Sequence, residues 1–408
     1  MFAPMKYKIL VGTSFTLVAV YYTVIFLGFR EPVLHGASDF SSFYAAGSIV
    51  GSGQGEHLYD YAAQQKAQER FLADLKFRGS PLLYVHAPFE LLLFLPLSGL
   101  SYPAALGVWF GCNLILLLAV PFLARASLPG IRDRIPAILL VFGFFFPATL
   151  TLIQGQDSIL LLLLFTLFYA ATKRGDARVA GLCLALAAFK PQLLLVVLLA
   201  MVWQRQWKVL GWFLRGSLIL VLASMALVGW RATLGFPQFL LAFDGLPAEI
   251  SGAYPQHMPN LRGALFAVLG AHLPAAALKL TTLGVTIGVL GILLHKIRRI
   301  PRGAENDLQL ALIVALTPLL AYHANKHDFV LLLLPFVLIL DHLQTRRART
   351  PNHWILGVSV AAVFLIPFVF PGALPLFCGV ALLTSSLYYE VAWSRTLQSA
   401  EGLASSRT

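Results

Sequence analysis

Charged residues are scarce in this 408-residue chain. Asp, Glu, Lys and Arg make up 12% of it, whereas 58% is hydrophobic and the mean hydropathy is +0.78. A soluble domain carries about 25% charged residues, and a chain this apolar has too few polar side chains to cover a soluble globule. The composition excludes a cytosolic enzyme, a nucleic-acid-binding protein and a disordered chain. It leaves a polytopic membrane protein whose apolar runs face lipid and one another.

Cysteine is also scarce. Cys112, Cys183 and Cys378 lie in apolar segments at no useful spacing, so we expect neither a disulfide framework nor a cysteine metal site. No A-x-A-like cleavage site follows the first apolar run, Leu10 to Phe29. This run is therefore interpreted as a membrane helix and not as a cleavable signal peptide.

Acidic residues are too few to balance the basic ones, and the net charge is +12. The basic residues gather in short clusters between apolar runs, which is typical of cytoplasmic loops. A nucleic-acid partner is therefore not expected. These clusters are Arg125 to Arg134, Lys173 to Arg178, Arg205 to Lys208, Lys296 to Arg302 and Arg346 to Arg349.

The charge pattern predicts the topology. Lys6 and Lys8 place the N-terminus in the cytoplasm, and the nearly neutral residues 30–86 form a long first outer loop. That loop carries a helix after Asp39 and an amphipathic, interfacial helix over Tyr61 to Leu75. Residues 231–260 form a second outer loop. We expect an all-α integral membrane protein with about ten to twelve transmembrane segments, residues 1–408 as one domain, and both termini in the cytoplasm.

Two apolar stretches are irregular. Pro96, Gly99 and Pro103 divide the run from Leu91 to Leu123 into a short and a long piece. The stretch from Val179 to Trp203 contains two segments of about twelve residues, each too short to span a membrane. They predict a hairpin with Lys190-Pro191 at its tip in mid-membrane. Broken backbone at that depth is tolerated only against protein or a water-filled cavity.

Polar residues beside apolar segments are candidate functional residues, because they are costly in a membrane. Asp39 could act as a general base, or it could form a helix N-cap pair with Ser38. Tyr84 and His86 lie where the first outer loop re-enters the membrane, although they could belong to an interfacial aromatic belt. Gln156 could recognise hydroxyl groups, or it could belong to an ordinary polar turn.

A second group of candidates follows in the later part of the chain. His323 and His327 are four residues apart and could share a helix face beside Asp328. A zinc pair would lack matched third and fourth ligands, so we expect no metal, and a simple polar turn remains the alternative. Lys190 and Arg262 suit an anionic lipid phosphate, or each could extend to a headgroup.

The order of several short motifs resembles the polyprenyl-phosphate-mannose-dependent mannosyltransferases of glycosyltransferase family 87, over roughly residues 30–335. The motifs are Asp39-Phe40, Phe43 to Ala46, Leu58 to Asp60, Tyr84 to Phe89 with Leu95 to Leu97, Gly155-Gln156, Phe189 to Pro191, Asn260 with Arg262-Gly263, and Thr317-Pro318 through His327 to Phe329.

The resemblance implies a GT-C fold and an inverting transfer of a hexose, mannose above all, from a polyprenyl-phosphate donor to a lipid or glycan acceptor. It implies Asp39 as the catalytic base, Lys190 and Arg262 around the lipid phosphate, and no cofactor. It also implies an active site on the outer face of a membrane, which we expect to be the bacterial inner membrane. The expected substrate-binding residues are Tyr84, His86, Gln156, Lys190, Asn260, Arg262, His323, His327 and Asp328.

Two other classes of function remain open at this stage. A secondary transporter or lipid flippase would also contain broken mid-membrane helices and intramembrane charges, although no inverted repeat is evident. A non-catalytic membrane scaffold would leave those charges without a purpose.

Overall fold

The chain is a bundle of helices. The computed structural model describes residues 2–72, 80–246, 251, 254–298, 306–345 and 352–405, and these residues contain no β-strand. The all-α class is therefore confirmed. Parts of both expected outer loops and the basic turn over 346–349 lie outside the described residues, as does much of the turn over 296–302.

Seven helical spans in the described part of the chain are long and apolar enough to cross a membrane. One helix pair, bent by 55°, adds an eighth, and four further apolar helices have 10 to 17 residues. The expected ten to twelve segments are reached only when these shorter helices are included. The seven spans are Met5–Ala37, Tyr102–Ala124, Trp207–Phe243, Ala275–His295, Lys326–Thr345, Asn352–Val369 and Ala373–Ala392.

Short 3-10 and π helices, labelled η, punctuate the α-helices along the chain. The first half contains α1 (Phe2–Pro32), η1 (Val33–Ala37), α2 (Phe40–Gly51), η2 (Gly55–His57), α3 (Tyr61–Glu69), η3 (Pro88–Glu90), α4 (Leu91–Phe94), η4 (Leu97–Gly99), α5 (Tyr102–Ala124), η5 (Pro129–Arg134), α6 (Ile135–Phe144), α7 (Phe146–Gln154), α8 (Ser158–Lys173), α9 (Ala177–Leu186), η6 (Ala187–Phe189) and α10 (Pro191–Trp203). The second half contains α11 (Trp207–Phe243), η7 (Pro255–His257), α13 (Leu261–Leu269), α14 (Ala275–Arg298), α15 (Asn306–Leu320), η8 (Lys326–Leu332), α16 (Leu333–Thr345), α17 (Asn352–Val369) and α18 (Ala373–Ser405).

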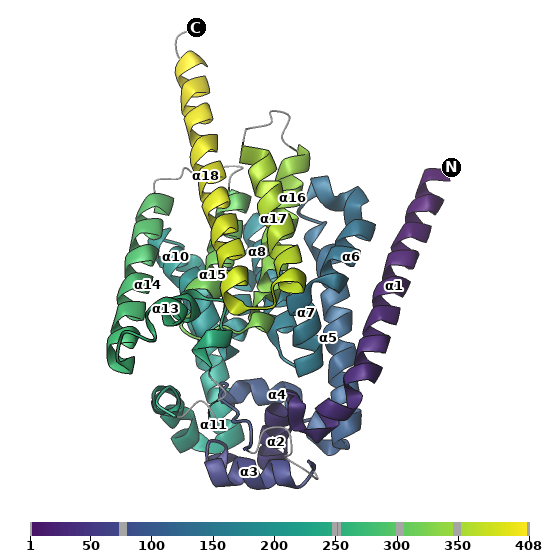
Figure 1. Cartoon of the computed structure of the whole chain (residues 1–408), viewed down its shortest axis with the longest axis vertical. Helices are drawn as coiled ribbons and strands as arrows, with labels where there is room; N and C mark the ends of the chain where they lie inside the picture. Colours follow the sequence, from purple (N-terminus) through teal and green to yellow (C-terminus); the bar gives the residue numbers. More distant parts are fainter. Residues whose placement is uncertain are drawn as a thin grey trace.

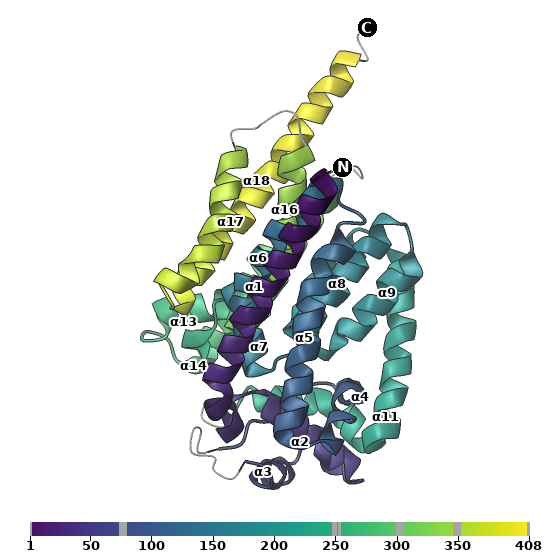
Figure 2. The same ribbon diagram turned by 90° about the vertical axis from the view of Figure 1, so that its right-hand side faces the viewer.

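The two ends of the bundle differ in their contents. Helix α1 begins and α18 ends at one end of the molecule, whereas α2, α3 and α4 gather at the other (Figure 1). Helix α1 lies on the outside against α6 and α7 (Figure 2), and only 17% of its most apolar window is buried. The exposed apolar face of α1 is therefore expected to contact lipid.

Both irregular stretches are broken where the sequence predicts. Helices α4 and η4 form the short piece before α5, and η6 ends at Phe189 before α10 begins at Pro191. Pro191 occupies the first turn of α10, where a missing N–H costs nothing. Proline also disfavours helical backbone in the preceding residue, and Lys190 has φ −115° and ψ 73°. The break between η6 and α10 is thus fixed by the Lys-Pro pair.

The second outer loop is shorter than expected. Residues 231–243 belong to α11, which continues to Phe243 across a break at Gly229, where φ is 83° and ψ is 160°. Glycine adopts this left-handed φ without a Cβ penalty, so the chain can bend there and continue as a helix. Beyond the break, Phe239 stacks on Tyr59 with ring centroids 4.6 Å apart. The end of α11 thus takes up residues 231–243 of the predicted outer loop, and Phe239 there packs against the first outer loop.

A cluster of buried aromatic residues holds the start of α2. The rings of Phe43 and Phe94 stack with centroids 4.6 Å apart, and Phe40 stacks on Tyr102 at 5.9 Å. These contacts join α2 to α4 and α5 and fix the position of Asp39, which immediately precedes Phe40.

Candidate active site

Polar side chains from five separate parts of the chain meet inside the bundle. They come from the start of α2, from η3 and its approach, from the α7–α8 turn, from the tip between η6 and α10, and from η8. The residues are Asp39, His86, Glu90, Gln154, Gln156, Asp157, Ser158, Lys190, His327 and Asp328. We call this set the polar network.

Lys190 is the hub of the polar network and is only 3% exposed. Its Nζ lies 2.7 Å from Asp157 Oδ1 and 2.8 Å from Asp328 Oδ1. It also donates hydrogen bonds to Ser158 Oγ at 2.7 Å and to Gln156 Oε1 at 3.2 Å. A buried cation is tolerable only when it is paired and hydrogen-bonded, and these four oxygen atoms meet that need.

Asp39 reaches the polar network through Gln156. Its Oδ2 accepts a hydrogen bond of 2.8 Å from Gln156 Nε2. Asp39 occupies the N-cap position of α2, yet its side chain makes no capping hydrogen bond, and Ser38 Oγ instead lies 3.3 Å from the Phe40 N–H. The capping alternative is therefore wrong for Asp39, whose half-buried carboxylate faces the α7–α8 turn.

Gly155 allows that turn to approach α2. Its φ of 63° and ψ of 33° end α7 in the left-handed conformation that favours glycine. A Cβ built on Gly155 would lie 2.6 Å from Phe40 Cβ. The Gly155 carbonyl accepts a hydrogen bond of 2.8 Å from Trp109 Nε1. Position 155 therefore needs a residue that has no Cβ and that adopts the left-handed backbone conformation, which is glycine.

His86 and Glu90 extend the polar network on its other side. His86 Nδ1 lies 3.0 Å from Glu90 Oε2 and 3.2 Å from Asp157 Oδ2. Burial opposes the charge on His86, but these two carboxyl groups outweigh it and raise its pKa to about 10. Burial also raises the pKa of Glu90 to about 8, with Asp157 adding to the effect against the opposing influence of His86.

These protonation states balance the charge. At neutral pH His86 and Lys190 carry a positive charge, Asp157 and Asp328 carry a negative charge, and Glu90 holds its proton. Two cations thus face two anions at the buried centre of the polar network, where an unpaired charge would be costly, while the half-buried Asp39 lies at its edge. Tyr84, expected to bind substrate, is fully buried. Its hydroxyl donates a hydrogen bond of 3.2 Å to Glu90 Oε2 and so holds this carboxyl group in place.

The sequence interpretation missed Glu90, although a signal for it exists. Glu90 is the only charged residue between His86 and Arg125. A lone acid in so long an apolar stretch is a functional candidate by the same reasoning that selected Asp39.

The His323–Asp328 segment contributes only its second half to the polar network. His327 Nδ1 lies 2.7 Å from Gln154 Oε1, and Asp328 Oδ2 accepts a hydrogen bond of 2.9 Å from the Asn325 N–H. Helix η8 begins at Lys326, so His323 lies in a bend before it. The expected shared helix face of His323 and His327 is therefore wrong. Burial, with the Arg262 charge second, lowers the pKa of His323 to about 4 and leaves it neutral.

Arg262 belongs to a neighbouring group of charges. Its guanidinium lies over the Tyr322 ring, 4.2 Å from the centroid, and 3.4 Å from Asp244 Oδ1. Lys279 also pairs with Asp244. His323 follows Tyr322 directly in the chain, and the charges of both Arg262 and Asp328 act on it.

Asn260 holds the helix that carries Arg262. Its Oδ1 accepts a hydrogen bond from the Gly263 N–H at 2.9 Å, and its Nδ2 donates to the Ala321 carbonyl at 2.9 Å. The first bond caps α13, and the second ties it to the chain just after α15. Asn260 is fully buried, so these two bonds give it a structural role in this structure.

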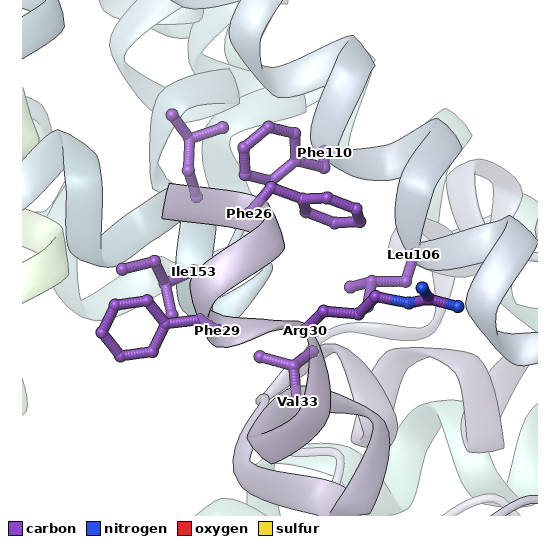
Figure 3. Close-up of a pocket in the computed structure, with 8 residues that line it drawn as sticks. Phe26, Phe29, Arg30, Val33, Leu106, Phe110 and Ile153 are labelled. Carbon is purple, nitrogen blue, oxygen red and sulfur yellow. The ribbon is translucent and has the colours of Figure 1, made fainter. Parts of the chain in front are cut away.

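Beside the site, α1, η1, α5 and α7 enclose an apolar pocket with one charged residue, Arg30 (Figure 3). Ile153 lines the pocket and immediately precedes Gln154, and Val33 lines it six residues before Asp39. The pocket is thus close to the polar network along two chain segments. Its other lining residues are Phe26, Phe29, Leu106, Phe110 and Leu152.

Comparison with models of known protein families identifies the family of this chain. The model of glycosyltransferase family 87 matches residues 84–322, which is more than half of the 408 residues. The chain belongs to glycosyltransferase family 87. No curated protein matches it. Together with its apolar helices, the family makes the protein a membrane glycosyltransferase, which confirms the resemblance at family level and sets aside the transporter and scaffold alternatives.

The family match covers only part of the polar network. His86, Gln156 and Lys190 lie within it, whereas Asp39 and Asp328 lie outside. Hydrogen bonds from Gln156 and Lys190 reach both outer residues. The fold of this glycosyltransferase therefore joins candidate residues from beyond both ends of the matched segment.

One part of the polar network has a ligand set that a metal ion could use. Ligand atoms of His86, Glu90 and Asp157 all lie within 4.8 Å of one another. The ammonium of Lys190 already lies 2.7 Å from Asp157, and it would repel a divalent cation placed beside it. We therefore assign this trio to the His86–Asp157 ion pair and to a protonated Glu90 beside it.

Proposed function

We propose that this family-87 enzyme transfers mannose, or a related hexose, from a polyprenyl-phosphate donor to a lipid or glycan acceptor, with inversion at the anomeric carbon. We further propose that it has a GT-C fold and works on the outer face of a bacterial inner membrane. The observation that carries the proposal is the Asp39 carboxylate, held by Gln156 at the edge of a buried, charge-balanced network.

In the proposed reaction Asp39 is the general base. It accepts the proton of an acceptor hydroxyl while the hydroxyl oxygen forms a bond to the anomeric carbon. The bond from that carbon to the phosphate oxygen breaks on the opposite face, which inverts the configuration, and the polyprenyl phosphate departs as an anion. Gln156 fixes one carboxylate oxygen and so the direction in which Asp39 meets the hydroxyl.

Arg262 is the cation that we assign to the donor phosphate. A guanidinium can bind phosphate through two parallel hydrogen bonds, and Arg262 shares a single carboxylate, Asp244, with Lys279. Lys190 already contacts four oxygen atoms. We therefore propose that Lys190 supplies positive charge through the polar network and does not touch the phosphate itself.

The remaining candidates suit the sugar and the lipid chain. His86, Gln156, His327 and Asp328 offer polar groups for sugar hydroxyls, and neutral His323 suits a hydrogen bond better than a charge contact. We place the lipid chain of the donor along the apolar surface around Arg30, because the pocket itself has room for only about one water molecule (Figure 3).

The test is transfer of radiolabelled mannose from polyprenyl-phosphate mannose by the full chain in detergent. Asp39→Asn should lower turnover by about 100- to 10,000-fold, the usual loss for a general base, without changing the thermal unfolding temperature. Asp60→Asn is the matched control, because Asp60 is exposed and lies in the same outer loop.

Near-normal turnover of Asp39→Asn would reject Asp39 as the base and leave Asp157 or Asp328 to be tested next. Other polyprenyl-phosphate hexoses, offered in competition, would identify the sugar. A cysteine placed at position 325 and labelled only from the cytoplasm would overturn the proposed outward orientation.

A further inference from the structure

A second group of titratable side chains lies near the opposite end of the bundle from α2, α3 and α4. His342 is three residues before the end of α16, His353 is the second residue of α17, and Glu390 lies within α18. The sequence interpretation did not identify these residues, and the proposed transfer reaction does not use them.

The three side chains converge on one point. His342 Nε2 lies 3.2 Å from Glu390 Oε1, and His353 Nε2 lies 3.1 Å from the same oxygen. All three ligand atoms lie within 4.8 Å of one another. Glu390 is fully buried, and the side chains of His342 and His353 are 10% and 8% exposed.

We propose that His342, His353 and Glu390 bind a zinc ion. Two imidazole nitrogens and one carboxylate oxygen are a common zinc ligand set, with metal–ligand bonds of about 2.0–2.2 Å. Ligand atoms at the corners of such a tetrahedron lie ~3.3 Å apart, close to the 3.1 and 3.2 Å found for two of the three pairs.

The surroundings of the carboxylate favour a fixed ligand. Asn352 Nδ2 donates to Glu390 Oε2 at 3.1 Å and to the Ser386 carbonyl at 3.0 Å. The amide therefore holds one carboxylate oxygen and leaves Oε1 directed at the two histidines. Outer hydrogen bonds of this kind orient metal ligands and tune affinity.

The position suits an ion that joins helices. The three ligands come from α16, α17 and α18, with His342 near the end of α16 and His353 at the start of α17. A zinc ion bound here would hold the C-terminal end of α16 against α17 and α18. The η8 segment that leads into α16 carries His327 and Asp328 of the candidate active site.

The experiment uses the full chain in detergent, without a polyhistidine tag, after treatment with a chelator. Zinc chloride is titrated in by calorimetry, and bound zinc is measured by elemental analysis. We expect one zinc per chain, proton release on binding and a higher thermal unfolding temperature. Cobalt(II) in place of zinc should give a visible spectrum of tetrahedral N/O coordination.

Two variants and two controls decide the assignment. Glu390→Gln and His342→Gln should each weaken zinc binding at least ~10-fold, since even changes behind the ligands cost that much. His272→Gln, at an exposed histidine, and His86→Gln, in the polar network, should keep the stoichiometry. Folded wild-type protein that binds no zinc, or binds no more than Glu390→Gln, would show a hydrogen-bonded cluster only. Zinc lost in His86→Gln alone would place the ion elsewhere and overturn the proposal.

Discussion

Asp39 and Gln156 are 117 positions apart in the chain, yet a hydrogen bond of 2.8 Å joins their side chains. The other end of the same Gln156 amide accepts a hydrogen bond from Lys190. One neutral side chain thus connects the proposed base to the buried charges, and the direction of Asp39 depends on it.

Replacement of Gln156 by leucine should therefore impair catalysis more than substrate binding. We expect kcat to fall on the order of 100-fold, the effect of a displaced reacting group. KM for the donor should rise by less than kcat falls, since Gln156 would give up only one of several contacts to the sugar. Gln65→Leu, which removes only a surface hydrogen bond to Glu69, serves as the control. Unchanged kcat in Gln156→Leu would show that Asp39 needs no such support.

Lys190→Met should destabilise the protein. It leaves Asp157 and Asp328 buried without their shared cation, and breaking a buried ion pair in this way costs about 3–5 kcal/mol. Lys173→Met is the control, because the Lys173–Asp307 pair is partly exposed and such pairs contribute about 0–1 kcal/mol. Thermal unfolding in detergent measures both, and equal losses would contradict the role of Lys190 as the hub.

Glu90 should make stability depend on pH. Its pKa is raised from 4.5 to about 8, so the folded state holds this proton more tightly than the unfolded state. Its contribution to the free energy of unfolding is complete below pH 4.5 and is lost as the pH rises through about 8. The His86 contribution has the same sign and is lost through pH about 10.

Unfolding of Glu90→Gln as a function of pH tests this assignment. The variant should lose stability less steeply than the wild type between pH 4.5 and about 8, with the His86 share of the fall remaining above pH 6.5. The exposed control Glu69→Gln should keep the wild-type profile. A Glu90→Gln profile parallel to that of the wild type would mean that another group titrates in this range.

Arg262→Met should weaken binding of the donor. The loss of a charged hydrogen-bond donor to phosphate is worth about 1.5–3 kcal/mol, which corresponds to about 10- to 150-fold in donor affinity, with acceptor affinity nearly unchanged. Arg231→Met removes an arginine that lies over the exposed Trp230 ring and is the control. Equal donor affinity in both variants would remove Arg262 from the phosphate site.

Gly155→Ala should lower the stability of the protein more than Gly53→Ala does. Both glycines have positive φ, 63° and 75°, so both alanines meet a backbone penalty of about 1–2 kcal/mol. Only at Gly155 would the added Cβ also collide with Phe40, since nothing lies within 4 Å of the position at Gly53. Activity should fall with stability only in Gly155→Ala, because Phe40 is adjacent to Asp39.

The sequence predicts much of the fold because its signals are local. Apolar runs, the Lys190-Pro191 break and the prolines before α5 each act within a few residues. The helix over residues 231–243 escapes prediction because it depends on stacking against Tyr59, far away in the chain. No local pattern carries that contact.

The candidate site is predictable in its parts but not in its connections. Asp39, Gln156, Lys190 and Asp328 stand out singly for their polarity, and only the fold shows that Gln156 joins Asp39 to Lys190. Glu90 could have been predicted, because it is a single acidic residue within a long apolar stretch. The separation of His323 from His327 does not follow from spacing, because it depends on where η8 begins.

The balance of charges around Lys190 also constrains how this protein can evolve. Loss of Lys190 alone would leave two buried anions against one cation, and loss of either carboxylate would leave an excess of positive charge. Each single step passes through a poorly folded intermediate, even where a double change would be tolerated. Lys190, Asp157 and Asp328 should therefore be inherited and replaced as one unit, so that related chains keep all three or none.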